Sequence, residues 1–188
     1  MQQYTAPSDS QYTTRQYDSH FGHQIVVDAA HAWIHLGRHF FCTESRSLST
    51  TNNYRWAVVV PSGGRRPHML FTVVSQIAYD FYLYEGASSV TGGSALPIRN
   101  NNRMSSTTSG LTITSGVTTG ADGTNLVTLN YGSPGPGGVG TLRGENELIL
   151  APYTYIVRVV AGGNGNLALN LNWYEPDYTT RADSGTAT

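Results

Sequence analysis

Alternation of apolar and polar residues is strongest between residues 153 and 177. Leu167, Leu169, Leu171 and Trp173 occupy every second position, with asparagine or alanine between them. A period of two predicts a β-strand with one face on the core. The apolar stretch before it has the same period, and glycine and asparagine separate the two. We therefore predict a β-hairpin that closes the fold and buries Trp173.

Strand-like segments cover most of the remaining chain. Residues 24–32 fit either a strand or a helical turn, and residues 33–45 indicate a strand broken or bent near Gly37. Residues 68–86 are long enough for one bent strand or two paired strands. The other strand segments are 52–62, 110–116, 124–132 and 145–160, and the loops are 86–109 and 133–141. About eight short strands separated by turn residues are typical of an antiparallel β-sandwich, and their even spacing favours a jelly-roll-like fold.

The predicted sandwich comprises residues 23–176, between an N-terminal arm at 1–22 and a flexible C-terminal tail at 177–188. The aromatic residues of the arm are Tyr4, Tyr12, Tyr17 and Phe21. The arm shows neither β nor helical periodicity, so it is either a disordered leader or an extended arm that becomes ordered against a neighbouring subunit. The second reading makes these aromatic side chains candidate contacts, because each can bury a large area.

The charge composition argues against several functions. Charged residues make up only 12% of the chain and the net charge is −1. A nucleic-acid-binding domain normally carries a basic patch, and none is evident. All 11 basic residues are arginine, so no lysine can serve a phosphate-binding loop or form a Schiff base.

Cysteine content and hydropathy suggest the cellular compartment. Cys42 is the single cysteine, which rules out an intrachain disulfide and a cysteine-rich zinc site. The first residues lack the apolar segment of a signal peptide, and the longest apolar run, at 56–61, is too short to cross a membrane. We expect a protein made and kept in the cytosol, or released without a signal.

Three histidines form the most suggestive metal-binding pattern. His31, His35 and His39 are spaced by four, which on a helix would place a zinc-binding trio on one face. Gly37 and the aromatic pair at 40–41 argue against a helix through this segment, and no cysteine or nearby carboxylate completes the set. We interpret these histidines as hydrogen-bonded to backbone or as flanking a subunit contact.

Enzyme motifs do not emerge from the pattern. Glu145 and Glu147 could imitate the carboxylate pair of a glycosidase, but such pairs come from different strands across a cleft. Two acids on one strand are more simply a solvated face. The glycine-rich loop 133–141 lacks the lysine and the strand-to-helix context of a phosphate site. We predict a non-enzymatic protein without catalytic, cofactor-binding or metal-binding residues.

Several segments occur together in a familiar order. They are "HAWIHLGRHFFCTES", "HMLFTV" followed by "YLYEG", "PIRNNNRMSSTTSGLTI", "ENELILAPYTYIVRVV" and "LNLNWYEPD". Over residues 24–176 this order resembles a group of small virion proteins of tailed bacteriophages that are encoded among head genes. The resemblance implies a jelly-roll-like protein that decorates or cements the capsid exterior, usually as a symmetric oligomer.

Three hypotheses follow for the function. The first is a structural virion protein, made in the host cytoplasm, that binds the major capsid protein and its own copies as a homotrimer on the capsid exterior. The arm aromatics would then also be capsid contacts. The second is a carbohydrate- or receptor-binding module of a head fibre or tail, with a host-surface glycan as ligand. The third, least supported by the residues, is a glycan-cleaving enzyme.

Overall fold

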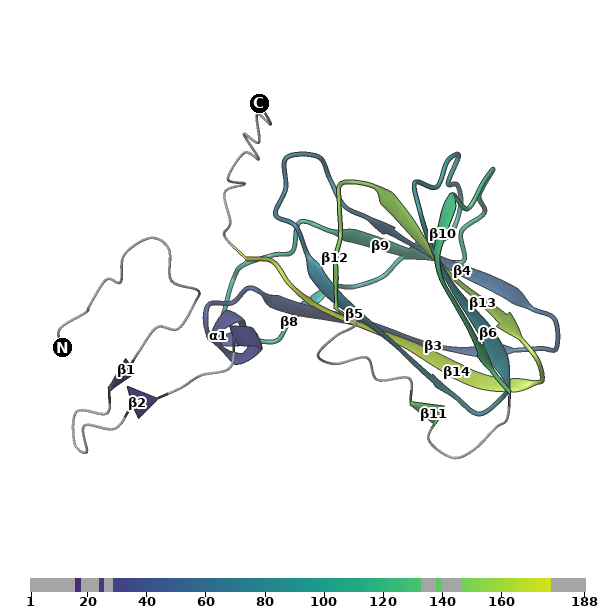
Figure 1. The fold of residues 1–188 in the computed structure, drawn as a ribbon, viewed down its shortest axis with the longest axis horizontal. Helices are drawn as coiled ribbons and strands as arrows, with labels where there is room; N and C mark the ends of the chain where they lie inside the picture. The colour runs from purple at the N-terminus through teal and green to yellow at the C-terminus, as the bar shows by residue number, and fades with distance from the viewer. Residues whose placement is uncertain (1–15, 18–23, 26–28, 133–137, 140–146, 177–188) are drawn as a thin grey trace, which may run out of the picture.

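The computed structural model describes residues 16–17, 24–25, 29–132, 138–139 and 147–176. These residues form two antiparallel sheets that lie face to face as a β-sandwich (Figure 1). The predicted all-β sandwich is therefore confirmed. A separate two-stranded pair, β1 (Gln16–Tyr17) with β2 (Gln24–Ile25), precedes the sandwich, so part of the predicted arm has β-structure.

The first sheet has six strands in the order β10-β6-β13-β4-β9-β7. Their bounds are β4 Asn53–Val59, β6 Tyr79–Glu85, β7 Ser94–Ala95, β9 Thr112–Ser115, β10 Thr124–Tyr131 and β13 Thr154–Ala161. β7 lies inside the segment predicted as the long loop 86–109. At the other edge of the sheet, β10 is a full-length strand.

The second sheet has the order β11-β5-β14-β3-β8, and β12 also pairs with β5. The bounds are β3 His39–Leu48, β5 His68–Ser75, β8 Arg99–Asn100, β11 Gly138–Val139, β12 Leu148–Ile149 and β14 Gly165–Tyr174. Three long strands thus form the centre of this sheet, and two-residue strands line its edges.

The predicted hairpin at residues 153–177 is wrong in its pairing. β13 pairs with β4 and β6 in the first sheet, whereas β14 pairs with β3 and β5 in the second. The chain crosses from one sheet to the other between them. The alternation of apolar and polar residues shows which face of a strand is buried, but not which strand it pairs with. Two strands that face each other across the core have the same alternation as two hydrogen-bonded neighbours.

The same crossing separates β5 from β6. The segment 68–86 was predicted as one bent strand or two paired strands, but β5 and β6 belong to opposite sheets. Ser75 supports the turn between them, because its hydroxyl donates to the carbonyl of Ile77 at 2.8 Å and accepts the Ile77 N–H at 3.1 Å. The first four long strands, β3 to β6, therefore alternate between the two sheets, whereas β6, β9, β10 and β13 all lie in the first sheet.

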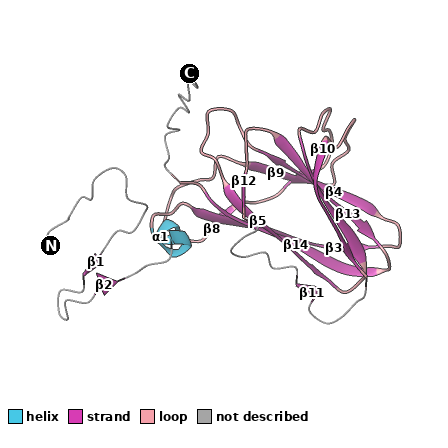
Figure 2. Ribbon diagram, viewed as in Figure 1, coloured by secondary structure: helices cyan, strands magenta, loops and turns pink. Residues whose placement is uncertain are grey.

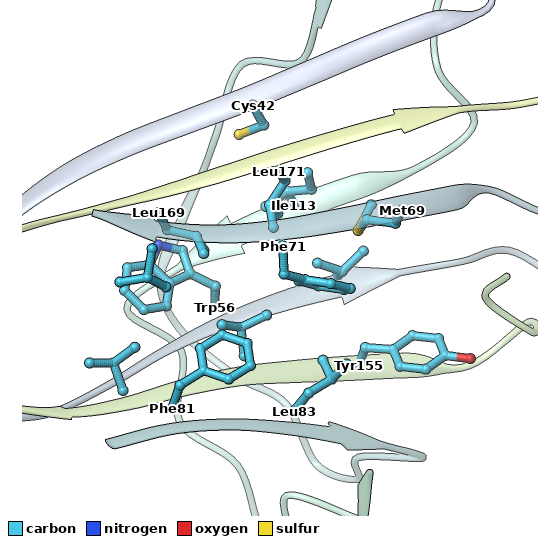
Figure 3. Close-up of a cluster of buried hydrophobic side chains, with 14 of the residues drawn as sticks. Cys42, Trp56, Met69, Phe71, Phe81, Leu83, Ile113, Tyr155, Leu169 and Leu171 are labelled. Carbon is cyan, nitrogen blue, oxygen red and sulfur yellow. The ribbon is translucent and has the colours of Figure 1, made fainter. Parts of the chain in front are cut away.

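The core lies between the inner faces of the two sheets (Figure 3). Side chains from β3, β5 and β14, including Cys42, Phe71 and Leu171, meet side chains from β4 and β6. Trp56 is 0% exposed and Trp173 is 1% exposed, so the prediction that Trp173 is buried is confirmed. The fold is stabilised mainly by this apolar burial.

A short helix, α1 (Ala29–His35), precedes the sandwich (Figure 2). The prediction of a bent strand over 33–45 is wrong for its first part, because the helix continues to His35 and the strand begins at His39. Gly37 ends the helix with φ +67°, and a Cβ there would lie 2.2 Å from the Ser105 hydroxyl oxygen, so only glycine fits. No helix in the described part of the chain has the length and apolar character to cross a membrane.

Candidate interaction surface

The outer face of the first sheet carries a cluster of two arginines around one carboxylate. Arg55 on β4 and Arg158 on β13 are direct neighbours across the sheet. Asp122, in the loop before β10, accepts hydrogen bonds from both. Arg55 donates through Nε at 2.9 Å and Nη2 at 3.2 Å, and Arg158 donates through Nη1 at 3.1 Å. The carboxylate thereby offsets the repulsion between two neighbouring cations.

The environment of Asp122 favours its ionised form. Its side chain is 11% exposed, and this burial by itself raises the pKa. Hydrogen bonds from Arg55 and Thr119, with the charges of Arg55 and Arg158, outweigh burial and hold the pKa of Asp122 below its usual value. Asp122 therefore stays charged at neutral pH and pins its loop over the sheet.

Two tyrosines extend this surface toward β10. The Arg158 guanidinium lies 4.4 Å from the ring centre of Tyr82 and 5.2 Å from that of Tyr84, and the two rings stack at 6.1 Å. Asn130 on β10 donates its amide to Asp80 on β6 at 2.7 Å. The face thus presents aromatic rings beside amide and carboxylate groups, which suits binding of a polar surface.

The edge of this sheet is formed by β10, eight residues of sequence TNLVTLNY. Among the described strands it pairs only with β6, and Leu126, at a bulge, is 40% exposed. The strand contains neither proline nor a charged residue, the two devices that usually protect a sheet edge. The sheet edges elsewhere in the described part of the chain carry two-residue strands, so β10 is the long edge open to another strand.

The structure brings together two of the three histidines considered for metal binding. His31 and His35 lie on α1 with their Nε2 atoms 2.9 Å apart. His39 lies on β3, where it contacts the amide of Asn101 and stacks on Tyr174. Among the described residues no group of three metal-binding side chains forms, so the trio is separated by the turn at Gly37.

The other candidate residues have mixed outcomes. Glu147 was predicted on a solvated face, but its carboxylate pairs with His68 Nδ1 at 2.9 Å, and its side chain is 27% exposed. Glu145 lies outside the described residues, as do Tyr4, Tyr12 and Phe21. Tyr17 is in β1, where only its backbone is described.

The opposite end of the sandwich contains a cavity of about 250 Å³. It lies beside β7, β8 and β9 and is lined by apolar side chains and by hydroxyl groups. Its lining residues are Phe40, Ala95, Leu96, Ile98, Asn100, Thr107, Thr108, Ser109, Leu111, Thr112 and Ile113. Because no charged side chain lines the cavity, it could hold a ligand only through apolar contacts and hydrogen bonds to neutral groups.

Sequence reasoning missed the Arg55–Asp122–Arg158 cluster. The signal was an arginine in the middle of each of two valine-rich strands, since a charged residue at the centre of a sheet normally has a partner of opposite charge. The partner, Asp122, is distant in sequence and could not have been selected from the chain alone.

Comparison of the chain with models of known protein families gave no match, and no curated protein and no solved structure is significantly similar to it.

Proposed function

We propose that this protein is a structural component of a bacteriophage particle. In this proposal it binds the major capsid protein and its own copies on the capsid exterior and performs no catalysis. The resemblance of residues 24–176 to small head-associated virion proteins suggests the setting. The observation that carries the proposal is the β10 edge, because eight uncharged strand residues at an open sheet edge favour pairing with another protein chain.

Self-association is the first part of the proposal. A low charge content and an uncharged open edge both reduce the electrostatic and desolvation cost of association between copies. Most homo-oligomers have closed symmetry. We propose a homotrimer at or near the symmetry axes of the shell. Light scattering at micromolar concentration should give a mass above that of the monomer, and a monomer both alone and with shell fragments would contradict this.

A matched pair of substitutions tests the β10 edge. Leu126→Lys puts a charge on the edge, whereas Val74→Lys puts the same charge on β5, inside the other sheet. The two side chains are similarly exposed, 40% and 38%. We expect Leu126→Lys to weaken self-association and Val74→Lys to leave it unchanged. Equal behaviour of the two variants would remove β10 from the contact.

Attachment to the shell is the second part. We propose that the arm, with Tyr4, Tyr12, Tyr17 and Phe21, lies across a neighbouring subunit or the shell in the particle. Ordering about twenty residues costs on the order of 1–2 kcal/mol each in backbone entropy, so only an extensive contact can offset it. Sedimentation with shells that lack this protein should show saturable binding.

A truncated protein that begins at Gly22 separates attachment from folding. We expect its melting temperature to match that of the full chain, while its binding to bare shells falls strongly. Unchanged binding would make the arm a passive leader. A lost melting transition would make the arm part of the folded domain.

A carbohydrate-binding module of a head fibre or tail is the second candidate function. Tyr82 and Tyr84 beside the Asp80–Asn130 pair favour it, because aromatic rings and planar polar groups are suited to sugar recognition. A glycan array distinguishes the two functions: binding to a defined glycan that Tyr82→Ala abolishes would favour the second candidate, and a blank array with saturable shell binding the first.

A further inference from the structure

The pair formed by His31 and His35 on α1 has the geometry of a two-ligand chelate. Their spacing of four places both rings on one face of the helix, and the Nε2 atoms are 2.9 Å apart with ring centres at 4.7 Å. Both side chains are exposed to solvent. A neutral imidazole pair at this distance shares one hydrogen bond, and one ring presents an unprotonated nitrogen.

The distance between the two Nε2 atoms is short enough for both to bind one metal ion. Two imidazoles bound to one metal at about 2.0–2.1 Å have nitrogens about 2.9 Å apart at a right angle and about 3.3 Å apart at a tetrahedral angle. The observed 2.9 Å is the length of the hydrogen bond between the two rings, and it equals the spacing of a right-angle site, so two ligands can reach one ion with little movement. Right-angle positions belong to square-planar, tetragonal and octahedral sites, which are typical of Cu²⁺ and Ni²⁺.

The helix that carries the pair is held in place. Trp33 stacks on Tyr174 of β14 with ring planes 7° apart, and Asn102 donates its amide to the carbonyl of His35 at 3.2 Å. His35 is also in the last turn of α1, where the helix dipole favours a cation. The two ligands are thus positioned before a metal arrives, which lowers the entropic cost of binding.

We propose that His31 and His35 form a surface binding site for a divalent transition metal ion, with Cu²⁺ preferred and Ni²⁺ next. Both histidines bind through Nε2 with the proton on Nδ1, so the ring that donates the hydrogen bond in the metal-free protein changes tautomer when the ion binds. Among the described residues no third histidine, cysteine or carboxylate joins them, so these two rings are the ligands that the described part of the chain supplies. Copper is preferred because it binds nitrogen ligands most strongly among the divalent first-row ions. The proposal is independent of the function proposed above.

Titration of the full chain with Cu²⁺ tests the site. We expect one ion per chain by calorimetry and an electron paramagnetic resonance spectrum of two equatorial imidazole nitrogens. His31→Ala and His35→Ala should each weaken binding on the order of 10²-fold, because the second ligand of a chelate adds effective concentration. Bound copper should also raise the melting temperature of the wild type but not of the double variant.

The chain provides its own matched control. His20→Ala with His23→Ala removes an equal number of histidines and leaves α1 intact, so Cu²⁺ binding should be retained. Circular dichroism checks that each variant is folded, and the spectrum of the wild type tests the site without any substitution. The proposal is overturned by the absence of saturable binding, by a spectrum without two imidazoles, or by binding that survives loss of His31 and His35.

Discussion

Two regions of the sandwich each contain a tryptophan and a serine that donate hydrogen bonds to a glutamate, but the first connects the two sheets and the second fixes a loop. In the first, which we call the Glu44 cluster, the indole N–H of Trp56 donates to Glu44 Oε2 at 2.6 Å, and the Ser115 hydroxyl donates to Oε1 at 3.0 Å. Arg46 Nη2 lies 2.7 Å from the same carboxylate. Because Glu44 and Arg46 are on β3 and Trp56 and Ser115 are on β4 and β9, this cluster connects the two sheets.

The second region, the Glu175 cluster, contains no cation from the part of the chain that the structure describes. Trp173 Nε1 donates to Glu175 Oε1 at 3.0 Å, the Ser109 hydroxyl donates to the same oxygen, and the backbone N–H of Gly110 contacts both carboxylate oxygens at 3.1–3.2 Å. Glu175 is 2% exposed, and no described arginine or histidine forms an ion pair with it. This cluster joins the end of β14 to the loop before β9.

The comparison shows two ways to accommodate a carboxylate inside a sandwich. Glu44 has a counter-charge that is itself partly in water, since the Arg46 side chain is 42% exposed. The hydrogen bond to Glu44 raises the pKa of Arg46 further above its usual value. Glu175 depends on three hydrogen-bond donors that are fixed by the backbone and the core. We therefore expect the Glu175 cluster to be the less tolerant of substitution.

Removal of either tryptophan should have the largest effect. Trp173→Ala and Trp56→Ala each delete a fully buried ring and should each lower the free energy of unfolding by about 3–5 kcal/mol. Chemical denaturation measures both. A Trp173→Ala protein that melts within a degree or two of the parent would contradict the packing of β14 described above.

Removal of the carboxylate should destabilise the protein more in the Glu175 cluster than in the Glu44 cluster. Glu175→Ala removes the acceptor of the Ser109 hydroxyl and of the Gly110 N–H, and it leaves Trp173 Nε1 only its longer contact with the Ser109 hydroxyl at 3.3 Å, so we expect a loss of about 3 kcal/mol. Glu44→Ala also removes the acceptor of the Trp56 N–H and of the Ser115 hydroxyl, but Arg46 can turn to water, so we expect the smaller loss of about 1–2 kcal/mol. Denaturant midpoints of the two variants give the comparison directly, and equal losses would show that the counter-charge makes no difference.

Replacement of each indole by a phenyl ring isolates the hydrogen bond. Trp173→Phe and Trp56→Phe retain most apolar contacts but remove the N–H donor, and we expect each to cost about 1–3 kcal/mol. A double-mutant cycle with the matching glutamate substitution should give a coupling energy above about 0.5 kcal/mol in both clusters. Additive losses would contradict the indole–carboxylate bond.

Loss of the counter-charge alone should have the smallest effect. Arg46→Met removes the ion pair with Glu44 but keeps an aliphatic side chain over Tyr54, whose ring centre lies 5.2 Å from the guanidinium. Because the arginine is partly solvated, we expect a change below about 1 kcal/mol, reduced further by salt. A loss comparable with that of Glu44→Ala would mean that the ion pair, rather than the indole and hydroxyl bonds, stabilises this cluster.

The sequence alone determined which side chains of β14 are buried. The period of two placed Leu167, Leu169, Leu171 and Trp173 on the core face, and the structure has all four between 1% and 2% exposed. It also indicated an all-β sandwich and the break at Gly37. These features are local, because the alternation of a strand and the need for glycine at positive φ are properties of neighbouring residues.

Only the tertiary structure decided which strands pair and which distant residues meet. β13 and β14 follow each other in the chain yet lie in opposite sheets, because paired strands and facing strands have the same alternation. Asp122 reaches Arg55 and Arg158, and Glu175 reaches Ser109, across separations that no local pattern encodes. The open edge at β10 is likewise a property of the assembled sheet, since a strand lies at an edge only because of how the other strands pair.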